Sequence, residues 1–281
     1  MPTVPLVLMC PTPNELAPIL AAVEVESRTR LGGAELLQAR LDGRPLALVR
    51  TGLGRLYAAA ATALVIERFR PEALVLCGVA AALDDGAQVG DICVPERIAD
   101  ADDGYRVDGE LVPGGFRLYD AAGATLKLRT IATDAQLGAC ANEAYNASPL
   151  RRLSGEPARL FGGSLASGAA FLRCSWTRLH LRESHGACAY EMEAAAVAQT
   201  ALAFDTPFGT VRAFSDSADD DLANDPFTTM QVHHFLDQHD AAGKTPPPNP
   251  SNPNATRSAA FALAFANAGA LALATARRWL A

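Results

Sequence analysis

The sequence has little basic charge, few aromatic residues and no long apolar run. Twenty-four Lys and Arg residues stand against 31 Asp and Glu residues, which gives a net charge of −7. Because proteins that bind nucleic acid polymers need a basic surface, we expect no such partner, while a nucleoside-sized ligand stays open. No window reaches the about 18 apolar residues of a membrane span, and the first ten residues lack the basic region of a signal peptide. We therefore expect a cytoplasmic protein without a membrane partner.

Metal and cofactor signatures are missing as well. None of the six cysteines forms a C-x-x-C pair, so we expect reduced thiols that serve as small apolar residues. His233, His234 and His239 lie near two aspartates, but their spacing matches no zinc signature, and we predict no metal site. The chain has neither a P-loop lysine motif nor a strand followed by G-x-G-x-x-G, so no cofactor is expected.

What the chain does have is ample core material, since 49% of its 281 residues are apolar. Short β-like runs at residues 4–10, 46–51, 73–77, 92–95, 160–167 and 208–215 alternate with helical stretches at 15–25, 57–70, 190–204 and 258–279. Residues 99–157 have the pattern of loops and one weak helix. This alternation predicts one domain over residues 1–281, a three-layer α/β/α sandwich with a central mixed β-sheet.

One stretch breaks this alternation. Residues 244–254 contain five prolines and three asparagines, a composition that excludes a helix or a central strand. We interpret the region around 241–256 as an insertion, either a solvated linker or a flap near the active site.

Four candidate residues follow from the position of the predicted strands. In α/β sheets ligands bind at the carboxyl ends of strands. Glu15 follows the first strand, Gly78 follows the third, Asp216 follows the last, and Glu193 opens the helix just before it. Three carboxylates from distant parts of the chain are thus expected at one edge of the sheet, although each alone also fits a helix cap or a surface charge.

At these positions the chain resembles a known family. The motifs that carry the resemblance, in chain order, are T-G-L-G at 51–54, the Gly78 segment, V-G-D-I at 89–92, A-S-G-A-A-F at 166–171, E-M-E-A at 191–194 and R-A-F-S-D-S-A-D at 212–219. Their order and spacing, from residue 4 to about 220, are similar to the nucleoside phosphorylase/nucleosidase superfamily. The most similar branch is that of the 5′-methylthioadenosine/S-adenosylhomocysteine nucleosidases.

The resemblance implies an enzyme that hydrolyses the N-glycosidic bond of a purine nucleoside without a cofactor. It implies that Glu15 activates water and that Asp216 protonates or hydrogen-bonds purine N7. It further implies that Glu193 binds the ribose hydroxyls, with Met192 beside the sugar. The remaining site residues implied are Phe171 stacking on the base, Leu172 at the base edge, and Ser215, Glu191, Gly78, Val79 and Arg212 around them.

Two alternatives stay open. Phosphorylases of the superfamily hold phosphate with arginines and a hydroxyl after the third strand, where this chain has Gly78 and Val79; Arg55 and Arg44 are the plausible phosphate ligands. A non-catalytic nucleoside-binding relative is the second alternative. Serine and glycine positions of the nucleosidase loop are replaced after Gly78, and Ala169 replaces an aspartate, so the purine and the 5′ substituent stay undefined. By resemblance we expect a homodimer, in which residues 109–115 complete a neighbour's 5′ pocket.

Overall fold

The computed structural model describes residues 4–108, 110–172, 175–216 and 253–281. His233, His234 and His239, residues 217–219 of the last motif and most of the region around 241–256 lie outside these ranges. Pro253 and Asn254, at the end of the Pro/Asn-rich run, begin the helix α7, contrary to the expectation of no helix there. Proline is tolerated in the first turn of a helix, where its missing N–H has no partner to lose.

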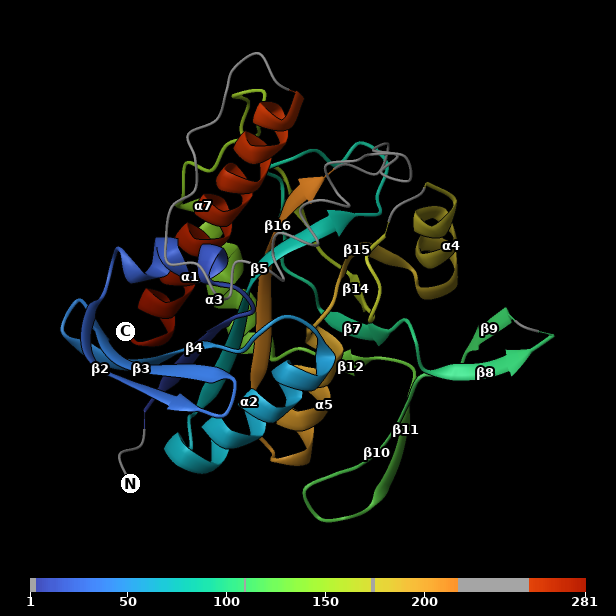
Figure 1. The fold of residues 1–281 in the computed structure, drawn as a ribbon, viewed down its shortest axis with the longest axis horizontal. Helices are drawn as coiled ribbons and strands as arrows, with labels where there is room; N and C mark the ends of the chain where they lie inside the picture. The colour runs from blue at the N-terminus through green and yellow to red at the C-terminus, as the bar shows by residue number, and fades with distance from the viewer. Residues whose placement is uncertain (1–3, 109, 173–174, 217–252) are drawn as a thin grey trace.

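Within the described residues, twelve strands form one mixed sheet (Figure 1). The main path runs β12 (Ile131–Ala132), β7 (Arg97–Asp100), β14 (Ser164–Ser167), β15 (Ala187–Glu191), β5 (Ala73–Ala82), β1 (Leu6–Cys10), β4 (Arg44–Arg50), β3 (Ala34–Leu41) and β2 (Glu24–Leu31). The remaining three strands are β16 (Phe208–Asp216), which pairs with β5 and β6 (Ile92–Cys93), and β13 (Leu160–Phe161), which pairs with β6. Strands β4, β1, β5 and β16 are parallel neighbours, so the segments that follow β1 and β16 leave the sheet at one edge.

Helices cover both faces of this sheet, as the three-layer prediction requires. On one face lie α2 (Arg55–Phe69) and α5 (Ala194–Ala203), and on the other α1 (Pro13–Leu20), α3 (Ala135–Asn146) and α7 (Pro253–Trp279). Strand β1 shows why: Val7 and Met9 pack in the α2/α5 core, whereas Leu6 and Leu8 pack in the α1/α3/α7 core. Each such buried side chain contributes about 1.5–3 kcal/mol. The α/β/α fold is confirmed.

The structure differs from the sequence-based elements in four places. The helix expected to reach residue 25 ends at Leu20, and β2, β3 and β4 then form an antiparallel meander. Residues 99–157 hold several short strands besides α3. Two elements share the stretch expected as one helix over 190–204, since β15 ends at Glu191 before α5 begins. Helix α4 (Ser175–His185), which packs on β14 and β15, was not expected.

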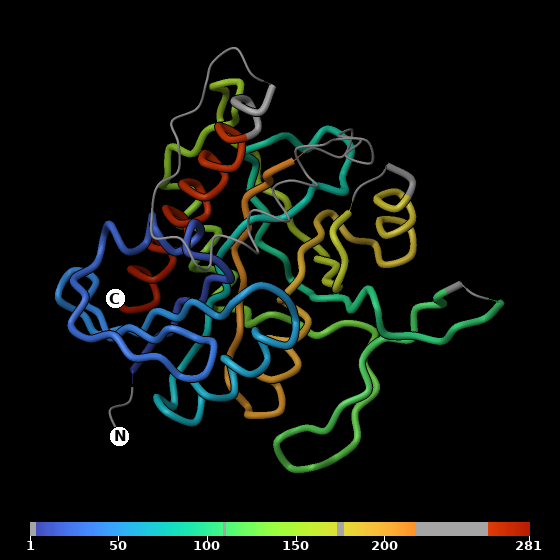
Figure 2. Tube along the Cα trace, in the orientation of Figure 1, coloured from blue at the N-terminus to red at the C-terminus, as the bar shows by residue number. Residues whose placement is uncertain are grey.

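Two hairpins stand out from the body of the molecule in both views (Figures 1 and 2). They are β8 (Gly104–Val107) with β9 (Glu110–Pro113), and β10 (Phe116–Tyr119) with β11 (Thr125–Leu128). Tyr105, Val107, Val112 and Tyr119 are exposed on them. A projecting hairpin with apolar side chains in solvent is a surface that a partner can cover.

Within α7, Ser258–Trp279 has the length and mean hydropathy (1.7) of a membrane-spanning helix, contrary to the expectation that no window of the chain qualifies. In the structure 56% of that window is buried, because α7 packs along α3, α1, β16 and β5. The helix predicted over residues 258–279 is confirmed, and its apolar composition serves the core.

Candidate active site

Glu15 lies buried in the first turn of α1, just beyond the carboxyl end of β1. Thr12 caps the helix, and its hydroxyl receives a 3.3 Å hydrogen bond from the Glu15 N–H. The Glu15 Oε2 atom in turn accepts from the Thr12 N–H at 2.9 Å and from the Thr12 hydroxyl at 2.7 Å. This reciprocal capping box fixes the side chain. Its other oxygen, Oε1, accepts from the Val79 N–H at 3.0 Å and thus reaches β5.

Gly78 makes room for the two charged groups that meet at this point. A Cβ atom there would lie 2.2 Å from Glu15 Oε1 and 2.6 Å from Arg212 Nη1. A carboxylate and a guanidinium therefore face the same small region from two sides, and only glycine leaves space for both. Gly78 and Val79 were predicted in a loop but lie inside β5, which continues to Ala82.

Two more carboxylates flank the start of α5. Glu191 ends β15, and its oxygens accept from the N–H groups of Glu193 and Ala194 at 2.9–3.0 Å and from Arg212 Nη2. Glu193 is the first residue before the helix, and its Oε1 accepts from the Gly54 N–H at 2.7 Å. Glu191 thus anchors the helix and the arginine, which leaves Glu193 as the carboxylate with fewer protein partners.

Arg212 is fully buried in β16, and only its Nη2 has a hydrogen-bond partner among the described residues. Its Nε and Nη1 have none within those ranges. Buried guanidinium donors without acceptors are costly, so a polar ligand or water is the expected partner. The Nη1 atom is the one that faces Gly78.

The crowding of charge changes the proton affinities of these groups. Burial and the neighbouring Glu191 raise the pKa of Glu193 to about 8. Burial also raises the pKa of Glu15, although Arg212 and the bonds from Thr12 and Val79 act in the opposite direction. The three buried carboxylates Glu15, Glu191 and Glu193 thus share one guanidinium, an arrangement typical of functional sites.

Asp216, at the end of β16, has a different environment from the one that the sequence suggested. Neighbouring carboxylates were expected beside it, but one oxygen accepts from Arg178 Nη2 and the other from the Ser215 hydroxyl at 2.8 Å. Arg178 is buried on α4 and also donates to the Ala82 carbonyl at 2.8 Å. Sequence reasoning missed Arg178 because α4 itself was not expected; a helical pattern after Cys174 would have been the signal.

The residues predicted to contact the nucleoside separate into buried and exposed ones. Leu172 is buried and lies in one apolar cluster with Tyr190, against which Met192 packs. Phe171 is 46% exposed, so one aromatic face is available to a ligand. Stacking on a base needs such a face.

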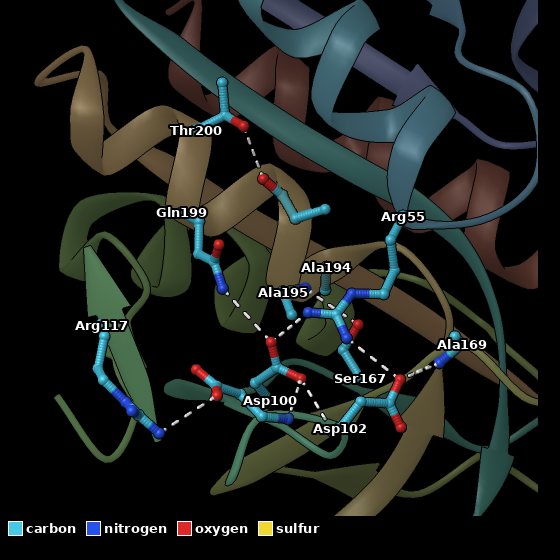
Figure 3. A network of polar contacts seen from close by, with 12 residues as sticks. Arg55, Asp100, Asp102, Arg117, Ser167, Ala169, Ala194, Ala195, Gln199 and Thr200 are labelled. Atoms are coloured by element: carbon cyan, nitrogen blue, oxygen red, sulfur yellow. Dashed lines mark hydrogen bonds and ion pairs between the residues drawn. The ribbon is translucent and has the colours of Figure 1, made fainter. Parts of the chain in front are cut away.

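Arg55, suggested above as a phosphate ligand, is occupied by two carboxylates instead (Figure 3). Its Nη2 pairs with Asp100, and its Nη1 lies 3.1 Å from Asp102 Oδ2. Asp102 Oδ2 also accepts from the Ala169 N–H at 2.5 Å. Because its charge is matched twice, Arg55 is poorly placed to hold phosphate.

In chemical terms the cluster can hold and deprotonate a water between Glu15 and Arg212 and can bind hydroxyl groups at Glu193. No group of three or more His, Cys, Asp or Glu side chains in the described ranges has the arrangement of metal ligands. The chemistry available to these residues is acid–base and hydrogen-bonding chemistry.

The sequence of the chain is similar to that of known proteins. The sequence model of the phosphorylase superfamily matches residues 5–243. The 5′-methylthioadenosine/S-adenosylhomocysteine nucleosidase of Geobacillus kaustophilus is 30% identical over 209 residues, which cover 73% of this chain and 81% of that protein. The nucleosidase of the same name from Mycobacterium bovis is 28% identical over 223 residues, which cover 78% and 88%.

Two solved structures have a similar fold. The nucleosidase of Neisseria meningitidis in complex with methylthio-immucillin-A has a TM-score of 0.72 at 23% identity, covering 97% of this chain and 98% of that one. Futalosine hydrolase of Helicobacter pylori has a TM-score of 0.73 at 19% identity, covering 97% of each chain. The chain therefore belongs to the phosphorylase superfamily, as an enzyme of its N-glycosyl hydrolase (nucleosidase) group.

Proposed function

We propose that this protein hydrolyses a purine nucleoside similar to 5′-methylthioadenosine or S-adenosylhomocysteine, releasing the free purine and the free pentose. The observation that carries the proposal is the meeting of Glu15 and Arg212 around Gly78, beside the two carboxylates at the start of α5. The names of the relatives support the nucleoside substrate.

The water that attacks C1′ is held, in this proposal, between Glu15 Oε1 and Arg212 Nη1. Glu15 takes a proton from the water as the new C–O bond forms, and the C1′–N bond to the purine breaks. Burial raises the pKa of Glu15 and makes it a stronger base than an exposed carboxylate. The Arg212 guanidinium supplies positive charge beside the oxygen and so orients the water.

The sugar is bound by Glu193, whose Oε1 already accepts from Gly54. Because the pKa of Glu193 is about 8, its carboxyl group holds a proton at neutral pH and can donate to one ribose hydroxyl while it accepts from the other. Positive charge that develops on the ribose as the bond breaks is stabilised by the surrounding carboxylates.

The leaving purine takes its proton through Asp216, with Leu172 at the base edge and Phe171 on its face. Ser215 holds one Asp216 oxygen, and Arg178 balances the charge on the other. Asp216 passes a proton to N7 as the C1′–N bond breaks, Arg178 stays beside the carboxylate that remains, and proton exchange with solvent restores Asp216 and Glu15.

The test is product analysis with the purified protein and a panel of nucleosides, including 5′-methylthioadenosine, S-adenosylhomocysteine, adenosine, inosine and cytidine. We expect free purine and free pentose in equal amounts and no cleavage of cytidine. Binding of purine nucleosides without turnover would favour the non-catalytic alternative, and cleavage of cytidine at the same rate would remove the purine assignment.

We also propose a homodimer in solution. Tyr105, Val107 and Val112 expose apolar surface on the β8–β9 hairpin, which projects from the body (Figure 2). A second copy that covers this hairpin would remove its apolar side chains from water. Sedimentation of the protein and of Val107→Glu tests this: we expect a dimer that the substitution weakens, and a monomeric parent protein would contradict it.

A further inference from the structure

We infer that Arg55 is a positioning residue, whose guanidinium ties the sugar side of the site to its base side. The inference rests on the proposed function, because the two sides are defined by the contacts proposed for Glu193 and for Phe171 and Leu172. Figure 3 shows Arg55 reaching from α2 toward Asp100, the last residue of β7, and toward Asp102, which follows that strand.

On the sugar side, Arg55 controls the position of a single N–H group. It is the first residue of α2, directly after Gly54, which donates to Glu193 Oε1 at 2.7 Å. Gly54 has a φ of 89°, which suits glycine, and has no side chain of its own to hold the loop. The start of α2 also lacks a side-chain cap. The Thr51 and Gly52 N–H groups hold the preceding loop to the end of β1, and the Arg55 guanidinium adds a side-chain contact from the start of α2 to Asp100 of the sheet.

On the base side, the same guanidinium acts through Asp102. Asp102 Oδ2 accepts from Arg55 Nη1 at 3.1 Å and from the Ala169 N–H at 2.5 Å. Ala169 opens the short segment that carries Phe171 and Leu172. A second hydrogen bond fixes this segment at Ala170, whose carbonyl accepts from the Tyr190 hydroxyl at 2.6 Å. Phe171 is 46% exposed and only partly held by packing, so these polar contacts help to set its position.

The two sides meet at Asp100, whose side chain is fully buried. Its Oδ1 accepts from the N–H groups of Asp102 and Asp103 at 2.9 and 3.2 Å. Its Oδ2 pairs with Arg55 and accepts from Gln199 of α5 at 3.3 Å. Because Glu193 precedes α5, the network links the helix that carries the sugar anchor to the segment that carries the base contacts.

Pairing with two carboxylates at once requires the planar guanidinium of an arginine. One guanidinium nitrogen serves the buried Asp100 and another serves Asp102, whose side chain is 40% exposed. A lysine ammonium is a compact point charge and does not span two carboxylates in the same way. Without Arg55, we expect Asp102 to turn into solvent and release the Ala169 N–H.

The experiment compares Arg55→Met, Arg55→Lys and Asp102→Ala with the control Arg278→Met, which removes a more exposed ion pair with Glu143 at the far end of α7. For each we would measure the melting temperature, kcat and KM for a riboside and its 2′-deoxyriboside, and inhibition by the free purine. Loss of a charge-assisted hydrogen bond corresponds to about tenfold to a hundredfold.

If Arg55 positions both sides, Arg55→Met weakens purine inhibition and also reduces the preference for the riboside, each by about tenfold or more. Asp102→Ala weakens purine inhibition alone. Arg55→Lys, which keeps a charge beside Asp100, regains the melting temperature and only part of the specificity. General destabilisation would not separate the effect on purine inhibition from the effect on riboside preference. If Arg55→Met fails to fold, Arg55→Lys and Asp102→Ala provide the test.

The inference is overturned if Arg55→Met behaves like Arg278→Met, or if Asp102→Ala reduces the riboside preference as much as it reduces purine inhibition. Failure of the proposed function looks different, since the parent protein itself would then cleave none of the nucleosides. A parent protein that cleaves them, with unaffected Arg55 variants, leaves the function intact and removes only the positioning role.

Discussion

Two buried arginine–carboxylate clusters in this protein differ in how completely their polar atoms are used. In the first, Asp91 receives four hydrogen bonds: from Arg152 Nε at 2.7 Å, Arg152 Nη2 at 3.0 Å, the Arg159 N–H at 2.6 Å and the Gln88 N–H at 3.0 Å. The third nitrogen of Arg152 pairs with Glu156. One charge is matched with another, and the loop around residues 151–159 is fixed to the strand β6 that follows Asp91.

In the second cluster, Arg212 faces Glu15, Glu191 and Glu193, and two of its nitrogens lack partners among the described residues. Carboxylates outnumber guanidinium groups, and the pKa of Glu193 rises to about 8 as a result of burial and the nearby Glu191. A saturated pair stabilises the fold, whereas an unbalanced cluster is retained for binding or chemistry. The V-G-D-I motif at 89–92 therefore has a structural role, whereas the E-M-E-A motif at 191–194 belongs to the candidate active site.

The largest effect is expected from Glu15→Gln. The amide keeps the shape of the side chain but cannot take a proton from water, so turnover should fall by about 10²–10⁴-fold. We expect only a moderate fall in the melting temperature, because the amide oxygen keeps the Thr12 contacts while the amide nitrogen loses the acceptor for the Val79 N–H. Steady-state kinetics and thermal unfolding of this variant and of the exposed control Glu143→Gln would check it. Turnover near that of the control would remove Glu15 from the mechanism.

The opposite pattern is expected from Asp91→Asn. The new amide N–H₂ group would face donors of Arg152, and the buried guanidinium would lose its counter-charge. Breaking one partner of a buried pair costs about 3–5 kcal/mol of unfolding free energy. Denaturant unfolding measures that loss, and kcat of the folded fraction should stay near its original value. A variant with normal stability and lost turnover would contradict the division between the two clusters.

The sequence predicted the layers of the fold and the placement of candidate carboxylates at the carboxyl ends of strands, because both depend on local patterns. The apolar runs at 4–10 and 73–77 are typical of a covered sheet, and the positions of Glu15, Glu193 and Asp216 follow from the strand ends. The short strands between residues 97 and 132 were missed because strands of two to four residues are too short for a recognisable period.

The charge partners within the site could not be predicted in the same way. Arg178 reaches Asp216 from a helix 38 positions earlier in the chain, and Arg55 reaches Asp100 across 45 positions. Such pairs depend on how helices pack on the sheet, which no local pattern contains. Gly78 was predicted to follow the third strand but lies within β5, where a glycine amid apolar residues indicates a close approach of other groups.

A smaller effect concerns the pH dependence of stability. The pKa of Glu193 is about 8 in the folded protein and near the ordinary 4.5 when unfolded, so the folded state holds a proton that the unfolded state loses. This contribution to stability is fully present below the unfolded value and is lost as the pH rises through about 8. We expect the unfolding free energy to fall between pH 5 and 8, and Glu193→Gln to show a shallower decrease in denaturant titrations. Parallel curves for the two proteins would contradict the raised pKa.

We expect added phosphate to have the smallest effect on the reaction. A rate that does not depend on phosphate would support the difference between the two clusters most directly. A ligand anion in the second cluster would approach Glu15, and two unit charges 4 Å apart repel by about 4 kcal/mol at an effective dielectric constant of 20. The Val79 N–H, which could otherwise hold an anion, already donates to Glu15, and Arg55 is paired with Asp100 and Asp102. Free pentose should therefore form at the same rate with and without added phosphate, and no sugar 1-phosphate should accumulate. Mass spectrometry of the products in phosphate-free and phosphate-containing buffer provides the measurement, with chloride at equal ionic strength as the control. A strict phosphate requirement would mean that Arg212, two of whose nitrogens have no partner among the described residues, binds the anion instead of orienting a water.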